Sequence, residues 1–131
     1  MAKMVLWSGM KGRVVLNGEP AAGAVLVRNY EWHWKDEKAS DRTTANANGE
    51  FSFPPIVGRS LLGGILPHEP VIDQAMTIEY KGKTYRAWNH FKHNYDENTE
   101  NPNRGQPINL TCRLDAERSA HGDVAGICDF N

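Results

Sequence analysis

Histidines in the second half of the chain are the residues best suited to metal chemistry. His90 and His93 lie three positions apart, and Asp96, Glu97 and the distant His33 could supply further ligands. Zinc needs three or four such donors converging within bonding distance. Histidines three apart share one face of a helix but lie on opposite faces of a strand. A metal site here therefore requires a local helical turn, and we expect polar surface histidines with no metal and no other cofactor.

Nucleophilic catalysis has little support in the residue pattern. Neither Ser8-Gly9 nor Gly58-Arg59-Ser60 stands in the G-x-S-x-G pattern of a nucleophile elbow. Neither cysteine has a neighbouring histidine motif that would activate a thiol. We therefore expect a protein that is not an enzyme.

An aromatic segment is the most informative stretch for binding. Tyr30, Trp32 and Trp34 alternate with polar residues, so a strand here would carry all three rings on one face. Two interpretations stay open. The rings could line the core, or they could project from a hairpin toward a partner, since aromatic residues are enriched at interface centres.

A polar connection, residues 89–100, is expected to join the loop at residues 32–38 in one partner surface, because connections cluster at the two ends of a sandwich. Glu100 is expected at the rim of that surface, where its removal would cost little. The predicted contact residues are Trp32, His33, Trp34, Lys35, Asp36, Glu37, His90, His93, Tyr95, Asp96 and Glu97.

The apolar loop Leu61–Pro70 has two possible roles. Its large side chains could plug one end of the sandwich, which is the role we expect for most of them. An exposed patch of this kind would instead mark a binding site. The side chains concerned are Leu61, Leu62, Ile65 and Leu66.

Short strands between glycine turns must position these groups. Asn17-Gly18, Asn48-Gly49 and Lys81-Gly82-Lys83 are turn signals between β-forming segments. Phe51 and Phe53 alternate around a serine, so both should face the core. Two further inward stripes are predicted, formed by Met76, Ile78 and Tyr80 and by Ile108, Leu110, Cys112 and Leu114. About seven such strands predict an all-β, single antiparallel β-sandwich, transthyretin-like or immunoglobulin-like.

Size and charge limit the function classes. The 131 residues fit one domain, which we place at residues 4–114, with residues 115–131 as a C-terminal tail. A net charge of -1 with scattered basic residues argues against a nucleic-acid partner. No apolar run approaches the roughly 18 residues that span a bilayer. As the sequence stands we expect a cytoplasmic protein, or a periplasmic one if a signal peptide was removed.

The two cysteines leave an alternative open. Cys112 and Cys128 could be unrelated thiols, or they could form a disulfide that pins the tail to the last strand. Such a bond would stabilise the fold by roughly 3 kcal/mol in the chain-entropy model. It would also indicate an oxidising compartment, in conflict with the missing signal.

Three motifs in order carry a family resemblance. Gly12-Arg13-Val14 is followed by Asn17-Gly18-Glu19-Pro20-Ala21-Ala22-Gly23-Ala24 and later by Thr43 to Phe53, which ends in Gly49-Glu50-Phe51-Ser52-Phe53. This order resembles the carboxypeptidase regulatory-like domain, a family with a transthyretin-like β-sandwich. The match covers the first half, whereas the Ser60–Pro70 insertion and the cysteine-bearing tail depart from the pattern. The resemblance implies a non-catalytic accessory or binding role.

The whole chain is also similar to small bacterial proteins that carry this domain and are linked to antibacterial secretion systems, including type VI secretion. We therefore predict a protein-binding module, most specifically an inhibitor or immunity-type protein that neutralises a bacterial toxin effector. One alternative is a module that binds cell-envelope glycans by stacking Trp32, Trp34, Trp88 and Tyr95 on sugar rings. A second is a small metal-dependent enzyme built around His90 and His93.

Overall fold

The computed structural model describes residues 3–60, 62 and 65–131 of the chain, and this part is all-β, as predicted. It contains thirteen strands rather than about seven, because short strands at the sheet edges and in the tail add to the long ones. No helix in the described part is long and apolar enough to cross a membrane. The strands are β1 (Met4–Trp7), β2 (Met10–Leu16), β3 (Glu19–Pro20), β4 (Val25–Trp32), β5 (Glu37–Thr44), β6 (Glu50–Phe53), β7 (Ile56–Gly58), β8 (Ile72–Tyr80), β9 (Lys83–Lys92), β10 (Ile108–Arg113), β11 (Ser119–His121), β12 (Val124–Gly126) and β13 (Cys128–Phe130), and a 3-10 turn, η1 (His33–Lys35), follows β4.

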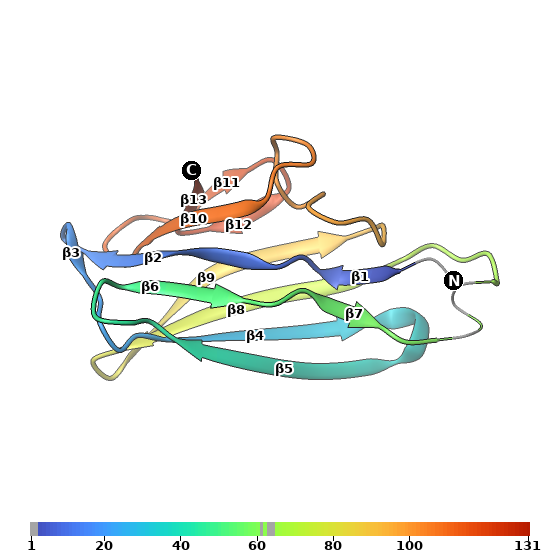
Figure 1. Ribbon diagram of the computed structural model, residues 1–131, viewed down its shortest axis with the longest axis horizontal. Helices are drawn as coiled ribbons and strands as arrows, with labels where there is room; N and C mark the ends of the chain where they lie inside the picture. The colour runs from blue at the N-terminus through green and yellow to red at the C-terminus, as the bar shows by residue number, and fades with distance from the viewer. Residues whose placement is uncertain (1–2, 61, 63–64) are drawn as a thin grey trace.

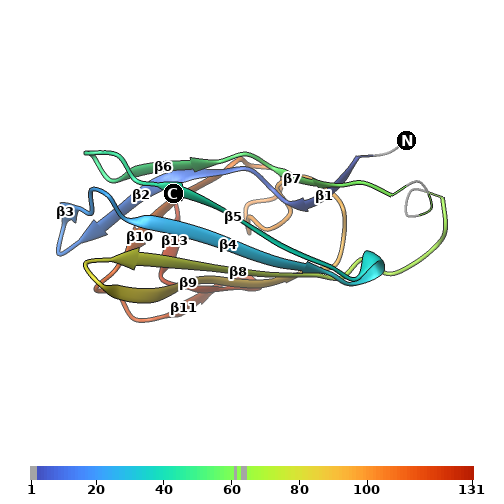
Figure 2. The same cartoon turned by 90° about the horizontal axis from the view of Figure 1, so that it is seen from below.

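Two larger sheets pack face to face (Figures 1 and 2). One sheet has the order β11-β12-β9-β8-β4-β5 and is antiparallel throughout. The other has the order β13-β10-β2-β3 with β6 also on β2, and its β2–β10 pair is parallel. A small antiparallel pair, β1 and β7, extends the lines of β2 and β6 toward one end of the molecule (Figure 1).

The predicted turns lie where the sequence places them. Asn17, Gly18 and Gly82 all have positive φ angles, of 51°, 82° and 75°. Gly49 combines a φ of 76° with a close approach, since a Cβ atom there would lie 2.4 Å from the carbonyl oxygen of Val14. Glycine is therefore required at this turn.

The core lies between the two larger sheets. The stripe from Ile108 to Leu114 and both phenylalanines, Phe51 and Phe53, are buried as predicted. Trp7 of β1 and Trp88 of β9 are also fully buried, and their rings stack with centroids 6.2 Å apart. Strand alternation thus orients side chains from both layers into this main core.

The C-terminal segment is part of both sheets. β12 pairs with β9, whereas β13 pairs with β10 on the opposite layer. Cys112 and Cys128 face each other in the β10–β13 register with Cα atoms 4.0 Å apart, and they form a disulfide. Of the two alternatives for the cysteines, the structure contains the bonded one, and the bond ties the last strand to the five-stranded sheet.

Candidate functional site

The aromatic segment belongs to two elements, because Tyr30 and Trp32 lie in β4 whereas Trp34 lies in η1. Alternation stops at Trp32, and η1 turns the chain so that Asp36, with a φ of 50°, leads it back into β5. Trp32 is fully buried in a small second core with Met4, Leu6 and Ile72. Its ring packs on Gly58, where a Cβ atom would lie only 2.7 Å from it. The predicted partner contact of Trp32 is therefore wrong, because the strand directs this ring inward.

Three connections meet at the end of the sandwich beside this small core. The Nε1 of Trp32 donates a hydrogen bond to the hydroxyl of Tyr95 at 2.9 Å. That hydroxyl lies 2.6 Å from Nε2 of His68, whose ring stacks on Trp34 with centroids 3.9 Å apart. Burial raises the pKa of Tyr95, and the bond from Trp32 opposes that rise. η1, the loop after β7 and the segment after β9 are thus fastened to one another.

One tautomer of His68 satisfies its polar contacts. Nδ1 lies 2.9 Å from the carbonyl oxygen of Leu66, which can only accept, so Nδ1 carries the proton. Nε2 then accepts from the hydroxyl of Tyr95. His68 could not be singled out from the sequence, because nothing local distinguishes a histidine that anchors a loop from one on the surface.

An apolar tip projects from this fastened loop and consists of Leu62, Ile65 and Leu66. Their side chains are 61%, 71% and 45% exposed. The backbone N–H groups of Ile65 and Leu66 both donate to the carbonyl of Leu62, at 3.0 Å and 2.7 Å. The plugging role is therefore wrong for these three residues, while Leu61 lies outside the described residues.

Several other predicted contact residues are accessible at this end. Lys35 donates to the carbonyl of Arg59 at 2.6 Å, so η1 also holds the start of the apolar loop. Glu37 accepts from the hydroxyl of Tyr30 at 3.0 Å. The remaining accessible residues of the predicted set are His33, Asp36, His93, Asp96 and Glu97, all exposed, and the half-buried Trp34 and Tyr95.

His90 does not belong to this surface. β9 continues to Lys92 with no helical turn, so His90 and His93 cannot share a helix face. His90 is buried on the inner side of the sheet, where Nδ1 donates to the carbonyl of Asp123 at 3.0 Å. His93 is exposed and lies 3.6 Å from Glu69. Both the contact role of His90 and the metal site around His90 and His93 are wrong.

A buried ion pair holds the segment after β9. Lys92 and Glu100 lie 3.7 Å apart with both side chains inaccessible to solvent. Glu100 accepts from the N–H and hydroxyl of Ser8, at 2.9 Å and 2.7 Å, and from the amide of Gln74 at 3.1 Å. The predicted rim position of Glu100 is therefore wrong, because the segment folds back and places this carboxylate inside.

Lys92 binds the same segment from the strand side. Its ammonium group donates to Oδ1 of Asn94 at 3.0 Å, to the hydroxyl of Thr99 at 2.7 Å and to the carbonyl of Asp96. Burial lowers the pKa of Lys92, although Glu100 and Asp96 oppose this shift. Burial alone would raise the pKa of Glu100, but Lys92 and the donors on Ser8 and Gln74 outweigh burial and hold it below its usual value.

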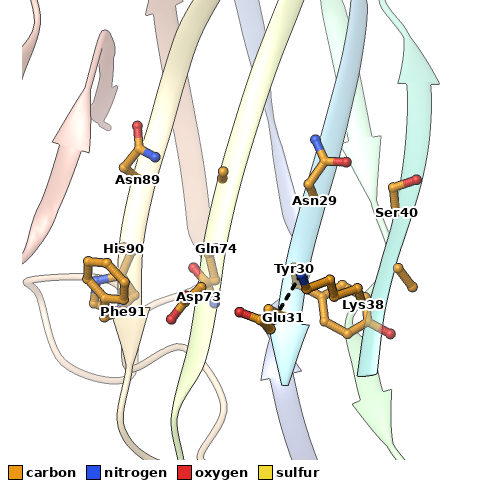
Figure 3. Close-up of a pocket in the computed structure, with 12 residues that line it drawn as sticks. Asn29, Tyr30, Glu31, Lys38, Ser40, Asp73, Gln74, Asn89, His90 and Phe91 are labelled. Carbon is orange, nitrogen blue, oxygen red and sulfur yellow. Dashed lines mark ion pairs between the residues drawn. The ribbon is translucent and has the colours of Figure 1, made fainter. Parts of the chain in front are cut away.

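The outer face of the six-stranded sheet carries a shallow hollow of about 610 Å³ (Figure 3). Two rows of directly opposed residues cross the strands β5, β4, β8 and β9 there. Ala75 contributes a small side chain to the lining, and Phe91, which also lines the hollow, is 62% exposed. The rows are Lys38, Glu31, Asp73 and Phe91, and Ser40, Asn29, Ala75 and Asn89.

At the end of this hollow, Nε2 of His33 lies 3.4 Å from Oε1 of Glu31 and 3.2 Å from Oδ2 of Asp73. Among the residues that the structure describes, Glu31, His33 and Asp73 form the group of three histidine and carboxylate side chains whose ligand atoms lie close enough together to hold a metal ion. His33 was predicted as a possible companion ligand, whereas Glu31 and Asp73 were not predicted.

Comparison with known proteins gives one family match. The model of the family described as a domain of unknown function, DUF6795, matches residues 10–117. Neither the curated proteins nor the solved structures contain a match.

Proposed function

The chain belongs to the DUF6795 family, and we propose that this member is a non-catalytic protein-binding module that recognises its partner with the apolar tip. One observation carries the proposal: Leu62, Ile65 and Leu66 are exposed within five residues of each other. Single exposed hydrophobic residues are ordinary, whereas a contiguous apolar patch rimmed by polar groups is typical of a binding surface.

The way the tip is held supports the proposal. The Trp34–His68 stack and the His68 bonds to Tyr95 and Leu66 fix the base of the loop on the sandwich. A loop held in this way loses less conformational entropy on binding than a floppy one. The base of the loop is therefore preorganised for binding.

Charged residues of both signs are exposed in the segments that are fastened to one another at this end. They include Lys35 and Asp36 at η1 and Glu69 in the loop after β7. Interfaces commonly combine an apolar centre with a polar rim. The partner that fits this end is a protein with an apolar pocket bordered by mixed charges.

A narrower proposal is that the module inhibits a bacterial toxin effector, as an immunity-type protein. It rests on the resemblance to the carboxypeptidase regulatory-like domain and to small bacterial proteins of antibacterial secretion systems. A compact sandwich with a firmly held apolar loop suits tight inhibition. The glycan-binding alternative loses support, because Trp32 and Trp88 are fully buried and cannot stack on sugar rings.

Site-specific photocrosslinking in the native cells tests the proposal. Photoreactive benzoylphenylalanine in place of Ile65 should give a discrete protein adduct, and the added substitution Leu66→Asp should abolish it. The matched control carries the same group at the exposed Lys83, in the β8–β9 hairpin, and should give no such adduct. No adduct from position 65, or the same adduct from both positions, would refute the proposal.

The identified partner then allows an energetic test. Ile65→Ala should weaken binding by about 2 kcal/mol or more if this side chain is a central anchor. Lys83→Ala should leave the affinity unchanged. Circular dichroism of both variants should match the unaltered protein, since neither side chain is part of the core.

A further inference from the structure

Two carboxylates face each other on the outer side of the six-stranded sheet. Glu31 of β4 and Asp73 of β8 are directly opposed in the antiparallel register. Like charges in that position destabilise a strand pair. Their side chains are 28% and 37% exposed, so solvent screens the repulsion only in part. A cation between the two carboxylates would remove this cost.

His33 brings a third donor to the same point. Its Nε2 lies 3.2 Å from the Asp73 oxygen and 3.4 Å from the Glu31 oxygen. The ligand atoms of all three residues lie within 4.8 Å of one another. Zinc bonds of about 2.0–2.1 Å in a tetrahedron place neighbouring ligand atoms about 3.3 Å apart. The two observed separations match the edges of such a tetrahedron.

The second oxygen of Glu31 has its own partner. Nζ of Lys38 lies 3.4 Å from Oε2 of Glu31, whereas His33 faces Oε1 (Figure 3 shows the Lys38 pair). Lys38 therefore orients the carboxylate without occupying the oxygen that faces the other two donors. Outer partners that orient ligands in this way are a regular part of metal sites.

We propose that Glu31, His33 and Asp73 bind one divalent transition-metal ion, with Zn²⁺ the best fit. An imidazole nitrogen combined with two carboxylate oxygens favours zinc over magnesium or calcium, which prefer all-oxygen sites. At least one further coordination position stays open to solvent. This proposal uses none of the residues of the apolar tip and does not rest on the proposed partner.

Titration calorimetry of the metal-stripped full chain with zinc sulfate tests the site. We expect saturable binding of one ion per chain. His33→Ala and Asp73→Asn should each lower the affinity by more than about tenfold, since even outer partners of a metal site are worth 10- to 100-fold. Magnesium chloride in place of zinc should give no comparable binding.

Two histidines with a single carboxylate neighbour provide matched controls. His93 lies 3.6 Å from Glu69, and His121 lies 2.8 Å from Asp129. His93→Ala and His121→Ala should leave zinc affinity unchanged. Equal losses in a control and in His33→Ala would overturn the proposal, as would the absence of saturable binding, which would leave His33 with an ion-pair role only.

Thermal unfolding provides a second readout. Zinc should raise the melting temperature of the unaltered protein, because an ion that binds only the folded state stabilises it. Asp73→Asn should fold well in the presence of a chelator, since it relieves the repulsion from Glu31, yet it should lose the zinc-dependent rise. A zinc-dependent rise of the same size in Asp73→Asn would contradict the assignment.

Discussion

Lys92→Met provides the sharpest test of the buried ion pair. Both side chains of the pair are fully inaccessible, and Glu100 would keep only the neutral donors of Ser8 and Gln74. Removing one partner of a buried pair costs about 3–5 kcal/mol, because the other charge stays buried without compensation. For a domain of this size each kcal/mol lowers the melting temperature by about 3–5 °C. The variant should therefore melt at least about 10 °C lower.

Urea unfolding followed by tryptophan fluorescence measures the effect, and a double-mutant cycle isolates the pair. Glu100→Gln should also destabilise the fold, whereas Lys92→Met with Glu100→Gln should cost less than the sum of the single changes. The coupling should fall in the range of about 0.5–3 kcal/mol found for contacting residues. Additive effects, or a loss below about 1 kcal/mol for Lys92→Met, would refute the assignment of a strong buried pair.

An exposed pair supplies the matched control. Arg113 and Asp129 lie 3.0 Å apart, with side chains 56% and 39% exposed. Exposed pairs contribute about 0–1 kcal/mol. Arg113→Met should therefore change the unfolding free energy far less than Lys92→Met.

The pH dependence follows from the same pair. The pKa of Glu100 in the folded protein lies below its usual value, so the carboxylate stabilises the fold above the unfolded pKa of about 4.3. This contribution is lost as the pH falls through the folded pKa. The stability gap between the unaltered protein and Glu100→Gln should narrow below about pH 4. A gap that stays constant on acidification would contradict this reasoning.

Three further predictions concern a core tryptophan, the disulfide and a half-buried tyrosine. Trp32→Ala should lower the unfolding free energy by about 3–5 kcal/mol in urea titrations, because the ring is fully buried; a folded variant of normal stability would contradict its core role. The non-reduced protein, unfolded, should show no free thiol, and replacing Cys112 and Cys128 with serine should cost about 3 kcal/mol for a closed loop with a sequence separation of 16. Burial, followed by the bond to Glu37, raises the pKa of Tyr30 to about 12, so one tyrosine should ionise near pH 12 in ultraviolet titration and Glu37→Gln should lower that value.

The site could be predicted from the sequence only in part. Trp34, Tyr95 and the charged residues near them do gather at one end, since sandwich connections end there. The exposure of Leu62, Ile65 and Leu66 could not be predicted, because an apolar loop can cover a core or leave it depending on the space beneath it. In this fold the small core at this end consists of Met4, Leu6, Trp32 and Ile72, and the three loop side chains do not belong to it.

Local chemistry by itself determined the all-β class, the turns and the inward stripes. Asparagine and glycine tolerate positive φ angles, so Asn17-Gly18 and Gly49 indicate turns from their residue types alone. The alternation of Phe51 and Phe53 around one serine places both rings on the same face of a strand. These signals need only a few neighbouring residues. They can therefore be interpreted without knowledge of the rest of the chain.

Tertiary structure alone decided the positions of the charged groups. Glu100 meets Ser8 across 92 positions of sequence, and Asp73 meets His33 only because β8 pairs with β4. A charged residue carries no local sign of whether a distant partner will compensate its burial. Only the assembled sheets determine which charges are buried in pairs and which remain on the surface, because desolvation and pairing depend on every element packed around them.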